Sequence, residues 1–226
     1  MSENETTDKP KPTAGTITRL QIQKKNKERA NIFLNGDYAF SLALSLAMDL
    51  KKGQELNAAE VKALQADDEV KRAYAAALNL LGYRARSITE VAQRLEQREF
   101  SEQAITQTTE RLLREGYLND TSFGQAWIES RQRSSPRSER ALRYELRLKG
   151  VEPEVIDEVL EQVELDEESA AWTALEPKLN RWHDLESFSF RQKAGSFLAR
   201  RGFGHDVVRP VLERAWAAMH AADEEE

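Results

Sequence analysis

Two patterns of hydrophobic and polar residues follow one another along the chain. Residues 16–22 and 30–34 are rich in alternating apolar positions, and a polar segment separates them. Asn35-Gly36-Asp37 comes next and supplies residue types that tolerate positive φ in a hairpin turn, so residues 38–42 are predicted to be the return strand. From Leu42 onward the apolar positions recur with a helical period. The pattern predicts a small β-meander followed by a chain that is mainly helical.

The predicted meander has two interpretations. Three short strands need a packing surface to be stable, so the meander is either a structural cap over the first helices or a docking element for a partner.

Helix starts are indicated by the capping boxes Asn57–Glu60 and Ser87–Glu90. Pro136 and Pro153 suit the first turn of a helix, where a missing N–H is tolerated.

The apolar pattern of the helical region repeats three times, at shifts of 51 and then 52 residues. The aligned positions are Val91, Leu95, Phe100, Ala104, Ile105 and Leu112, then Leu142, Leu146, Val151, Val155, Ile156 and Val163, then Ala194, Leu198, Phe203, Val207, Val208 and Ala215. In each copy the first pair lies on one helix face, a tight break follows, and the last positions line a second helix. The pattern therefore predicts three tandem units.

The break in each unit falls at one position. Gly150 and Gly202 stand there in the second and third copies, where a left-handed helix cap uses glycine, whereas Glu99 stands there in the first. The first copy's turn is therefore expected to differ slightly from the other two.

A further helix is expected upstream of each pair, which gives three helices per unit. These upstream helices are predicted at residues 73–81, 123–131 and 170–179. The expected fold is mainly α, with three tandem three-helix repeats in an elongated, curved array and a small N-terminal β-rich extension. The expected organisation is a disordered tail (1–15), the β-rich extension (16–56), the first repeat with its preceding helix (57–117), the second repeat (118–167), the third repeat (168–220) and an acidic tail (221–226).

Composition narrows the class of protein. The chain has 226 residues, 33 Lys and Arg, 39 Asp and Glu, and a net charge of −6, so charge-driven coating of nucleic acid is not its whole function. The absence of Cys excludes disulfides, thiolate metal sites and cysteine nucleophiles. The polar N-terminus is unlike a signal peptide, and no apolar run approaches the ~18 residues of a membrane span. We expect a cytoplasmic protein without membrane contacts.

The charges are distributed unevenly. Residues 1–68 hold 10 basic and 10 acidic groups, residues 69–150 hold 15 and 11, and residues 151–226 hold 8 and 18. A basic middle segment is thus joined to an acidic C-terminal third, which is typical of distinct interaction surfaces.

An arginine stripe is the sharpest local feature of the basic segment. At about 100° per residue, Arg137, Arg140, Arg143 and Arg147 fall within roughly a third of a helical turn, opposite Leu142 and Leu146. Planar guanidinium groups suit phosphate or carboxylate recognition, so we interpret the stripe as an interaction surface. The alternative is a solvated helix face on which Glu139 and Glu145 are local ionic partners.

A second, weaker basic group lies in the first unit. It consists of Arg84, Arg86, Arg94 and Arg98, and ordinary i,i+4 pairing with Glu90 and Glu102 explains it as well as function does.

Enzyme signatures are absent. The chain contains no GxxxxGK[ST], GxGxxG or GxSxG motif, and His183, His205 and His220 are far apart in the sequence, without HExxH spacing. We expect no enzymatic activity, no cofactor and no metal, and we interpret the histidines as surface or cap residues. The four tryptophans, at 127, 172, 182 and 216, are expected to be packing anchors in preference to base-stacking platforms.

Four segments, in this order, resemble the RecX family, regulatory proteins of the RecA recombinase. The similarity runs from about Thr16 to Trp216, and the segments are residues 84–91, residues 116–120 with Phe123, Trp127 and Arg131, residues 145–151 and residues 197–203. The resemblance implies three tandem three-helix repeats and a non-enzymatic role. That role is to bind the RecA–DNA filament along its groove and to inhibit strand exchange and the ATPase and coprotease activities in DNA repair and the SOS response.

The resemblance and the charge pattern together suggest contact residues. We expect a monomer that contacts RecA and the single-stranded DNA within the filament, with weak affinity for bare DNA because the net charge is acidic. The candidate contact residues are Arg131, Arg133, Arg137, Arg140, Arg143, Arg147, Lys149, Arg86 and Arg94.

Two other functions stay open at this point. Three-helix units resemble helix-turn-helix folds, so the chain could be a sequence-specific DNA-binding regulator. Its candidate recognition helix, residues 206–215, offers only Arg209 and Arg214 toward bases, however. A structural helical adaptor is the third possibility, and it would bind neither filament nor nucleic acid.

Overall fold

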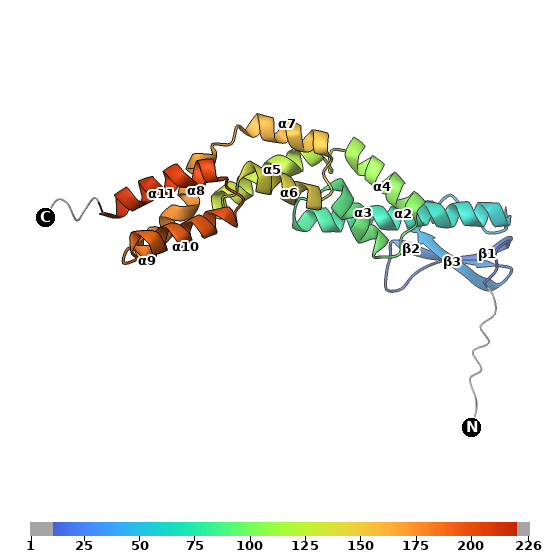
Figure 1. The fold of residues 1–226 in the computed structure, drawn as a ribbon. Helices are drawn as coiled ribbons and strands as arrows, with labels where there is room; N and C mark the ends of the chain where they lie inside the picture. The colour runs from blue at the N-terminus through green and yellow to red at the C-terminus, as the bar shows by residue number, and fades with distance from the viewer. Residues whose placement is uncertain (1–10, 221–226) are drawn as a thin grey trace, which may run out of the picture. The chain divides into compact units, whose positions relative to one another are not determined.

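A computed structural model of the chain describes residues 11–220 (Figure 1). Most of the expected N-terminal tail and the whole acidic tail at 221–226 lie outside the described residues. Within them the protein is mainly helical, and an N-terminal four-stranded antiparallel sheet precedes three three-helix repeats. This confirms the predicted combination of a β-rich extension with tandem helical repeats.

The described chain divides into two compact units. One contains residues 11–84 and 92–115, and the other contains residues 85–91 and 116–220. The division runs through a single helix, α3 (Ile88–Glu96). Its first residues, up to Val91, belong to the second unit and make hydrogen bonds within it.

The sheet contains the strands predicted from the sequence and one more. Its order is β3-β2-β1-β4, formed by β1 (Gly15–Ile22), β2 (Arg29–Leu34), β3 (Asp37–Ala43) and β4 (Glu55–Leu56). Asn35 and Gly36 join β2 to β3 with φ values of 51° and 97°. Two successive positive φ values define the hairpin turn that matches the twist of the flanking strands, so the hairpin prediction is confirmed.

The segment that follows β3, within the predicted β-rich extension at 16–56, contains one further strand that the mainly helical pattern after Leu42 did not show. A single helical turn, α1 (Leu44–Ala47), leads into a loop and then into β4, which pairs with the start of β1. The Gly53 N–H donates to the Ile17 carbonyl, and the Ile17 N–H donates to the Gln54 carbonyl. Two residues are too few for a strand pattern to be visible in the sequence, and the pairing with β1 supplies the missing information.

A buried carboxylate attaches the sheet to α2 (Ala58–Tyr83), the helix beside it in Figure 1. Asp68 is 4% exposed, and it accepts hydrogen bonds from Arg29 Nη2 at 2.9 Å, from Arg72 Nε at 3.1 Å and from the Ala43 N–H at 2.6 Å. The bonds from Arg29 and Ala43 come from the sheet, as expected for a structural cap over the first helices. The docking interpretation of the meander stays a hypothesis.

Each repeat contains the three helices that the apolar pattern predicts. The first uses the end of α2 with α3 and α4 (Glu102–Arg114). The second uses α5 (Asp120–Ser134), α6 (Glu139–Leu148) and α7 (Pro153–Val163). The third uses α8 (Glu167–Leu175), α10 (Ser187–Ala199) and α11 (His205–His220), with η1 (Glu176–Lys178) and α9 (Leu179–Trp182) as an extra connection after α8.

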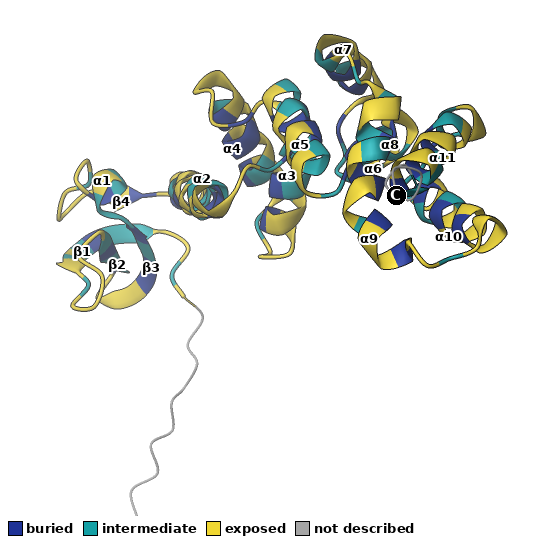
Figure 2. Ribbon diagram, turned by 90° about the vertical axis from the view of Figure 1, so that its left-hand side faces the viewer, coloured by how far each residue is buried: buried dark blue, intermediate teal, exposed yellow. Residues whose placement is uncertain are grey.

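The aligned apolar positions form the repeat cores. Leu142, Leu146 and Ile156 are buried in one cluster within the second repeat, and Ala194, Leu198 and Ala215 are buried in another within the third. Figure 2 shows the buried residues as stripes along helices whose other faces are exposed. Each of these two repeats therefore has a hydrophobic core of its own.

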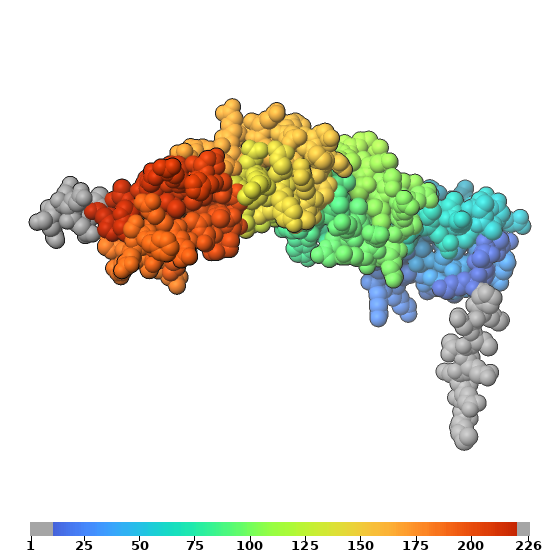
Figure 3. Space-filling model, viewed as in Figure 1, coloured from blue at the N-terminus to red at the C-terminus, as the bar shows by residue number. Residues whose placement is uncertain are grey.

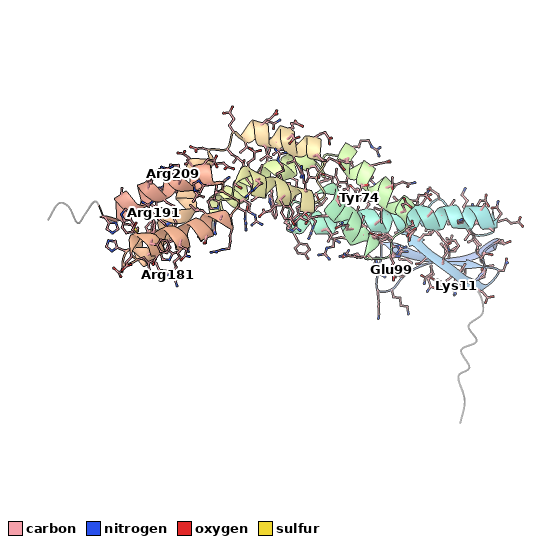
Figure 4. The ribbon with its side chains drawn as sticks, viewed as in Figure 1. Lys11, Tyr74, Glu99, Arg181, Arg191 and Arg209 are labelled. Carbon is pink, nitrogen blue, oxygen red and sulfur yellow. The ribbon has the colours of Figure 1, made fainter. Side chains whose placement is uncertain are left out.

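The turns after α3, α6 and α10 have the same geometry in all three repeats. Glu99, Gly150 and Gly202 have φ values of 63°, 73° and 94°. In each case the next residue's N–H donates to a carbonyl five residues back: Phe100 to Leu95, Val151 to Leu146 and Phe203 to Leu198. This is the Schellman helix end. The expectation that the first turn would differ was wrong, because Glu99 (labelled in Figure 4) adopts the left-handed conformation despite its side chain.

The predicted helix starts were mostly correct. Asn57 and Glu60 form the reciprocal capping box, Ser87 Oγ accepts from the Glu90 N–H, and Pro153 occupies the first turn of α7. Pro136 does not begin a helix, contrary to prediction. Ser138 caps α6 by accepting from the Ala141 N–H, so the helix begins at Glu139 and Pro136 lies in the connection between α5 and α6.

Replacing Glu99 with glycine should stabilise the protein. A left-handed conformation costs a non-glycine residue about 1–2 kcal/mol, and part of the gain is offset by the greater freedom of glycine in the unfolded chain. We expect Glu99→Gly to raise the free energy of unfolding by about 0.5–1 kcal/mol in urea titrations. Gly150→Ala should lower it by more than that amount, because φ is again positive and a Cβ there would lie 2.5 Å from Thr89 Cβ. Effects of the same sign for both variants would contradict this account.

Candidate interaction surface

The position of α6 is fixed by two joints between repeats that use equivalent residues. At the first joint Ser87 Oγ donates to the Lys149 carbonyl at 2.5 Å, and Thr89 Oγ1 donates to the Gly150 carbonyl at 2.9 Å. The second joint lies 51 or 52 residues further on. There the Ser138 N–H donates to the Arg201 carbonyl at 3.2 Å, and Arg140 Nη2 donates to the Gly202 carbonyl at 3.1 Å.

A third bond completes each joint. The first N–H of the middle helix donates to a carboxylate at the start of the next repeat: Ile88 to Asp120 Oδ1 at 2.9 Å, and Glu139 to Glu167 Oε1 at 2.6 Å. In both joints, therefore, the C-terminal turn of one middle helix lies against the N-terminal cap of the preceding one. Figure 3 shows the resulting direct contact between the yellow second repeat and the orange third repeat.

Glycine is required at the joints for close approach as well as for its backbone angles. A Cβ on Gly150 would lie 2.5 Å from Thr89 Cβ, and a Cβ on Gly202 would lie 2.7 Å from Ala141 Cβ. Glu99 has the same backbone conformation, but it is exposed and takes part in neither joint. This explains why a side chain is tolerated there.

The predicted arginine stripe is only partly a feature of α6. Arg137 precedes the cap residue Ser138 and lies outside the helix, so placing it on the helical stripe was wrong. The remaining stripe residues, Arg140, Arg143 and Arg147, lie on α6, opposite the buried Leu142 and Leu146.

Glu145 binds two of the candidate arginines internally. Its Oε2 accepts from Arg131 Nε at 2.7 Å and from Trp127 Nε1 at 2.9 Å, and its Oε1 lies 2.9 Å from Arg137 Nε. The Arg131 guanidinium also stacks over the Trp127 ring, 4.5 Å from its centroid. Arg137 therefore has the local ionic partner that the alternative expected, and Arg131 shares that partner.

Arg143 is also paired. Its guanidinium donates to Glu139 at 2.9 Å and to Asp157 of α7, and these hydrogen bonds, with Asp157 the larger contribution, raise the pKa of Arg143 above its ordinary value. Arg143 therefore links the second and third helices of its repeat.

Three candidate arginines of the second repeat have no carboxylate partner among the described residues. The Arg147 side chain makes no hydrogen bond or ion pair within this part of the chain. The Arg140 guanidinium donates only to the Gly202 carbonyl, and the Arg133 guanidinium donates only to the Glu129 carbonyl. All three are exposed. Arg140 and Arg147 share one face of α6, and that face can bind an anionic or hydrogen-bonding partner.

The remaining candidates lie at or near the first joint. Lys149 Nζ is 2.8 Å from Glu90 Oε1 and 5.0 Å from the centroid of the Trp127 ring. The exposed Arg94 donates to Gln97, and Arg86 is half-buried between α2 and α3 and is not a free cation. The structure thus brings Lys149 close to Trp127 in the second unit, whereas Arg94 binds to Gln97, directly after the end of its own helix.

Sequence reasoning missed two exposed apolar residues beside the arginines of α6. Tyr144 is 63% exposed and Leu148 is 68% exposed, and their spacing of four places them side by side on the helix next to Arg140 and Arg147. Aromatic and guanidinium groups together are typical of protein interfaces. An exposed Tyr-x-x-x-Leu pair opposite the buried leucines was the signal that could have identified them. We call Arg140, Tyr144, Arg147 and Leu148 the α6 face.

The tryptophans pack as predicted, and two histidines lie closer together than expected. Trp182 is buried in the core of the third repeat, and the other three tryptophans pack against the repeat cores. His183 and His220 come together, with ring centroids 5.7 Å apart and nearly parallel planes, because the end of α11 returns to α9. Among the described residues, no group of three or more His, Asp or Glu side chains could hold a metal ion.

None of the helices within residues 11–220 is both long enough and apolar enough to cross a membrane.

Sheet, repeats and joints together define a tandem three-helix repeat protein with an N-terminal β-sheet cap. Four family models match the chain in order: the Regulatory protein RecX N-terminal domain at 15–57, and the first, second and third RecX three-helix domains at 73–112, 119–160 and 166–212. The chain belongs to the RecX family of regulatory proteins.

Individual relatives agree with this assignment. The regulatory protein RecX of Bacillus licheniformis is 36% identical over 87% of this chain and 76% of its own length. That of Bacillus subtilis is 34% identical over 88% of this chain and 76% of its own length. A crystal structure of a regulatory protein RecX has a TM-score of 0.68 at 24% identity, with 88% of this chain and 99% of that chain covered. RecX from Lactobacillus salivarius has a TM-score of 0.58 at 21% identity, with 66% and 97% covered. These structural matches show that the fold is shared.

Removing the Glu145 carboxylate should destabilise the second repeat. Glu145→Ala leaves the Trp127 N–H and Arg131 Nε without their shared acceptor, and it removes the carboxylate that is paired with Arg137. We expect the free energy of unfolding to fall by about 2–3 kcal/mol, since hydrogen bonds to charged groups contribute more than neutral ones. The exposed Glu129 of α5 provides a control, and Glu129→Ala should change stability by less than about 0.5 kcal/mol. Equal losses measured by urea unfolding would contradict the role of Glu145.

Stability should also depend on pH through Asp120. Burial raises the pKa of its carboxyl above the ordinary value despite the hydrogen bond from Ile88, and the charges of Glu152 and Glu90 add to the effect. A pKa that is higher in the folded state means that stability falls as pH rises through that value. Asp120→Asn keeps an oxygen acceptor for Ile88, so its stability relative to the unsubstituted protein should increase from pH 3 to pH 7. A difference in unfolding free energy that does not change with pH would contradict the assignment.

Proposed function

We propose that this protein regulates the RecA recombinase by binding the RecA–DNA filament and inhibiting strand exchange, ATP hydrolysis and coprotease activity. The observation that carries the proposal is the ordered match of all four RecX domains along the chain. The proposal includes action as a monomer in the cytoplasm, in DNA repair and the SOS response, with RecA and the single-stranded DNA of the filament as partners.

The α6 face is the surface that we assign to filament contact. Arg140 and Arg147 are exposed and lack carboxylate partners among the described residues, and Tyr144 and Leu148 beside them are largely exposed. A partner that covers this face would gain charge-assisted hydrogen bonds together with buried apolar area. The neighbouring arginines have a supporting role. Arg131 and Arg137 are paired with Glu145, and Arg143 is paired with Glu139 and Asp157. Arg133, Lys149, Arg86 and Arg94 stay secondary candidates for the same contact.

The alternative, a sequence-specific DNA-binding regulator, receives no support from its candidate recognition helix. Arg209 of α11 pairs with Glu213 at 3.1 Å, and the Arg214 guanidinium stacks over Trp172, 3.8 Å from the ring centroid. Both arginines that would read bases are therefore engaged within the third repeat. An adaptor without any filament contact would give no reason for the exposed arginines of α6.

The first test is titration of the protein into RecA assembled on single-stranded DNA, with ATP hydrolysis and strand exchange as readouts. Inhibition at substoichiometric ratios, with weak binding to bare DNA, is the expected result. No effect on RecA, together with tight sequence-dependent binding to duplex DNA, would replace this proposal with the DNA-regulator alternative.

Reversing the charges of the α6 face should abolish inhibition. The variant Arg140→Glu with Arg147→Glu keeps the Arg131, Arg137 and Arg143 ion pairs and two of the three hydrogen bonds of the second joint, and it loses the bond from Arg140 to Gly202. We expect a folded protein and at least about a tenfold loss of inhibitory potency. The control is Arg181→Glu with Arg191→Glu, because both residues are exposed in the third repeat (Figure 4) and the net charge change is the same. Circular dichroism verifies folding. Potency that falls equally in both double variants would assign the effect to net charge and would exclude the α6 face.

A further inference from the structure

Each joint contains a positive charge at an equivalent position, and only in the first joint is that charge paired with a carboxylate. Lys149 precedes Gly150 in the first joint, and Arg201 precedes Gly202 in the second, so the two cations occupy equivalent positions. Lys149 is paired with Glu90 at 2.8 Å. Ala141 stands 51 residues after Glu90, at the equivalent position of the second repeat. Arg201 therefore lacks the carboxylate that its counterpart has.

The surroundings of Arg201 offer no substitute for that carboxylate. Its Nε is buried and has no hydrogen-bond partner among the described residues, and its guanidinium lies over Phe197, 3.9 Å from the ring centroid. Burial lowers the pKa of Arg201, and the neighbouring charges of Arg137 and Arg200 lower it further. The nearest charged neighbours that act on Arg201 are thus also cations.

The cluster as a whole has excess positive charge. Arg137 is paired with Glu145 at 2.9 Å, but that carboxylate also binds Arg131. Arg200 is exposed, and its side chain makes no hydrogen bond or ion pair with the described residues. Unpaired, partly buried charge is unfavourable, and an anion that binds there would remove the penalty and gain charge-assisted hydrogen bonds.

We propose that Arg137, Arg200 and Arg201 form a phosphate-binding site at the joint between the second and third repeats. These arginines come from two separate segments of the chain, and the hydrogen bond from the Ser138 N–H to the Arg201 carbonyl holds the segments together. A tetrahedral phosphate presents oxygens in several directions, whereas a single carboxylate presents two in one plane. Guanidinium groups bind phosphate with a geometry that lysine does not provide.

The site adjoins the α6 face. Arg140 donates to the carbonyl of Gly202, the residue directly after Arg201, and is itself a member of that face. The inference deepens the proposed function and rests on it only for the source of the phosphate, which is the DNA backbone of the filament or a free nucleotide. Binding of phosphate itself needs no RecA and is tested without it.

The test is isothermal titration calorimetry of inorganic pyrophosphate into the full chain at constant ionic strength. Saturable binding with one site is expected, and Arg201→Gln should weaken it by at least about tenfold. The control Arg209→Gln removes the same charge from the exposed surface of α11 and should bind like the unsubstituted protein. Absence of saturable binding, or equal affinity in Arg201→Gln, would overturn the proposal.

A second variant tests the charge argument with all three arginines present. Ala141→Glu places a carboxylate where the first joint has Glu90, so it should raise the thermal unfolding midpoint without pyrophosphate and weaken pyrophosphate binding. Unchanged binding in a folded Ala141→Glu protein would contradict the site even if Arg201→Gln failed to fold.

Competition identifies the source of the phosphate. Displacement of pyrophosphate by a thymidine oligonucleotide at lower concentration than by thymidine monophosphate would indicate the DNA backbone, and equal displacement would indicate a free nucleotide. Either result supports a phosphate site, whereas displacement by an oligoglutamate peptide as effective as the oligonucleotide would overturn it in favour of a protein carboxylate. Arg147→Glu leaves the hydrogen bonds of the second joint unchanged. Pyrophosphate binding that survives in this variant, while RecA inhibition weakens, would separate the phosphate site from the α6 face.

Discussion

The close approach of the glycine backbone to the cap of the preceding middle helix, at each repeat joint, is the constraint on which the second unit depends. Each joint brings the C-terminal turn of one middle helix against the cap of the preceding one, and Gly150 and Gly202 leave no room for a Cβ. The carbonyls exposed by the helix end are then satisfied by Ser87 and Thr89 in one joint and by Ser138 and Arg140 in the other. Helix termination and repeat association are therefore one event, since the same groups serve both.

Apolar spacing predicted the repeats well because it reports which side of a helix is buried. It placed Leu142 and Leu146 in a core correctly, and the positive φ of Asn35 and Gly36 followed from their residue types. Contacts between distant segments could not be predicted in this way. The strand β4 depends on pairing with β1, and Asp68 depends on donors from the sheet. No pattern within a short window contains that information.

The arginines show the limit of sequence reasoning for the candidate site. Helical geometry placed Arg140, Arg143 and Arg147 on one side of α6, yet it could not show that Arg143 reaches Asp157 or that Arg131 and Arg137 converge on Glu145. Arg137 lies outside α6 because Ser138 is the cap and the helix begins one residue later, at Glu139. Guanidinium groups that share a carboxylate build the scaffold, and those without one are available to a partner.

The joints also give each repeat a distinct part in assembly. The first repeat has a serine cap, Ser87, that binds the helix end of the next repeat. It has Glu99 in place of a joint glycine, so its own helix end does not form a joint with a preceding cap. The second repeat has both Gly150 and Ser138 and can do both. The third has Gly202, but its middle helix begins at a Glu186 cap that makes no side-chain hydrogen bond, and Phe190 occupies the position aligned with Ser138. Single residues thus determine which repeat can begin, extend or end the array. Of the three repeats, the second has both the cap and the glycine, so it has both parts of a joint that a repeat duplicated in tandem would need.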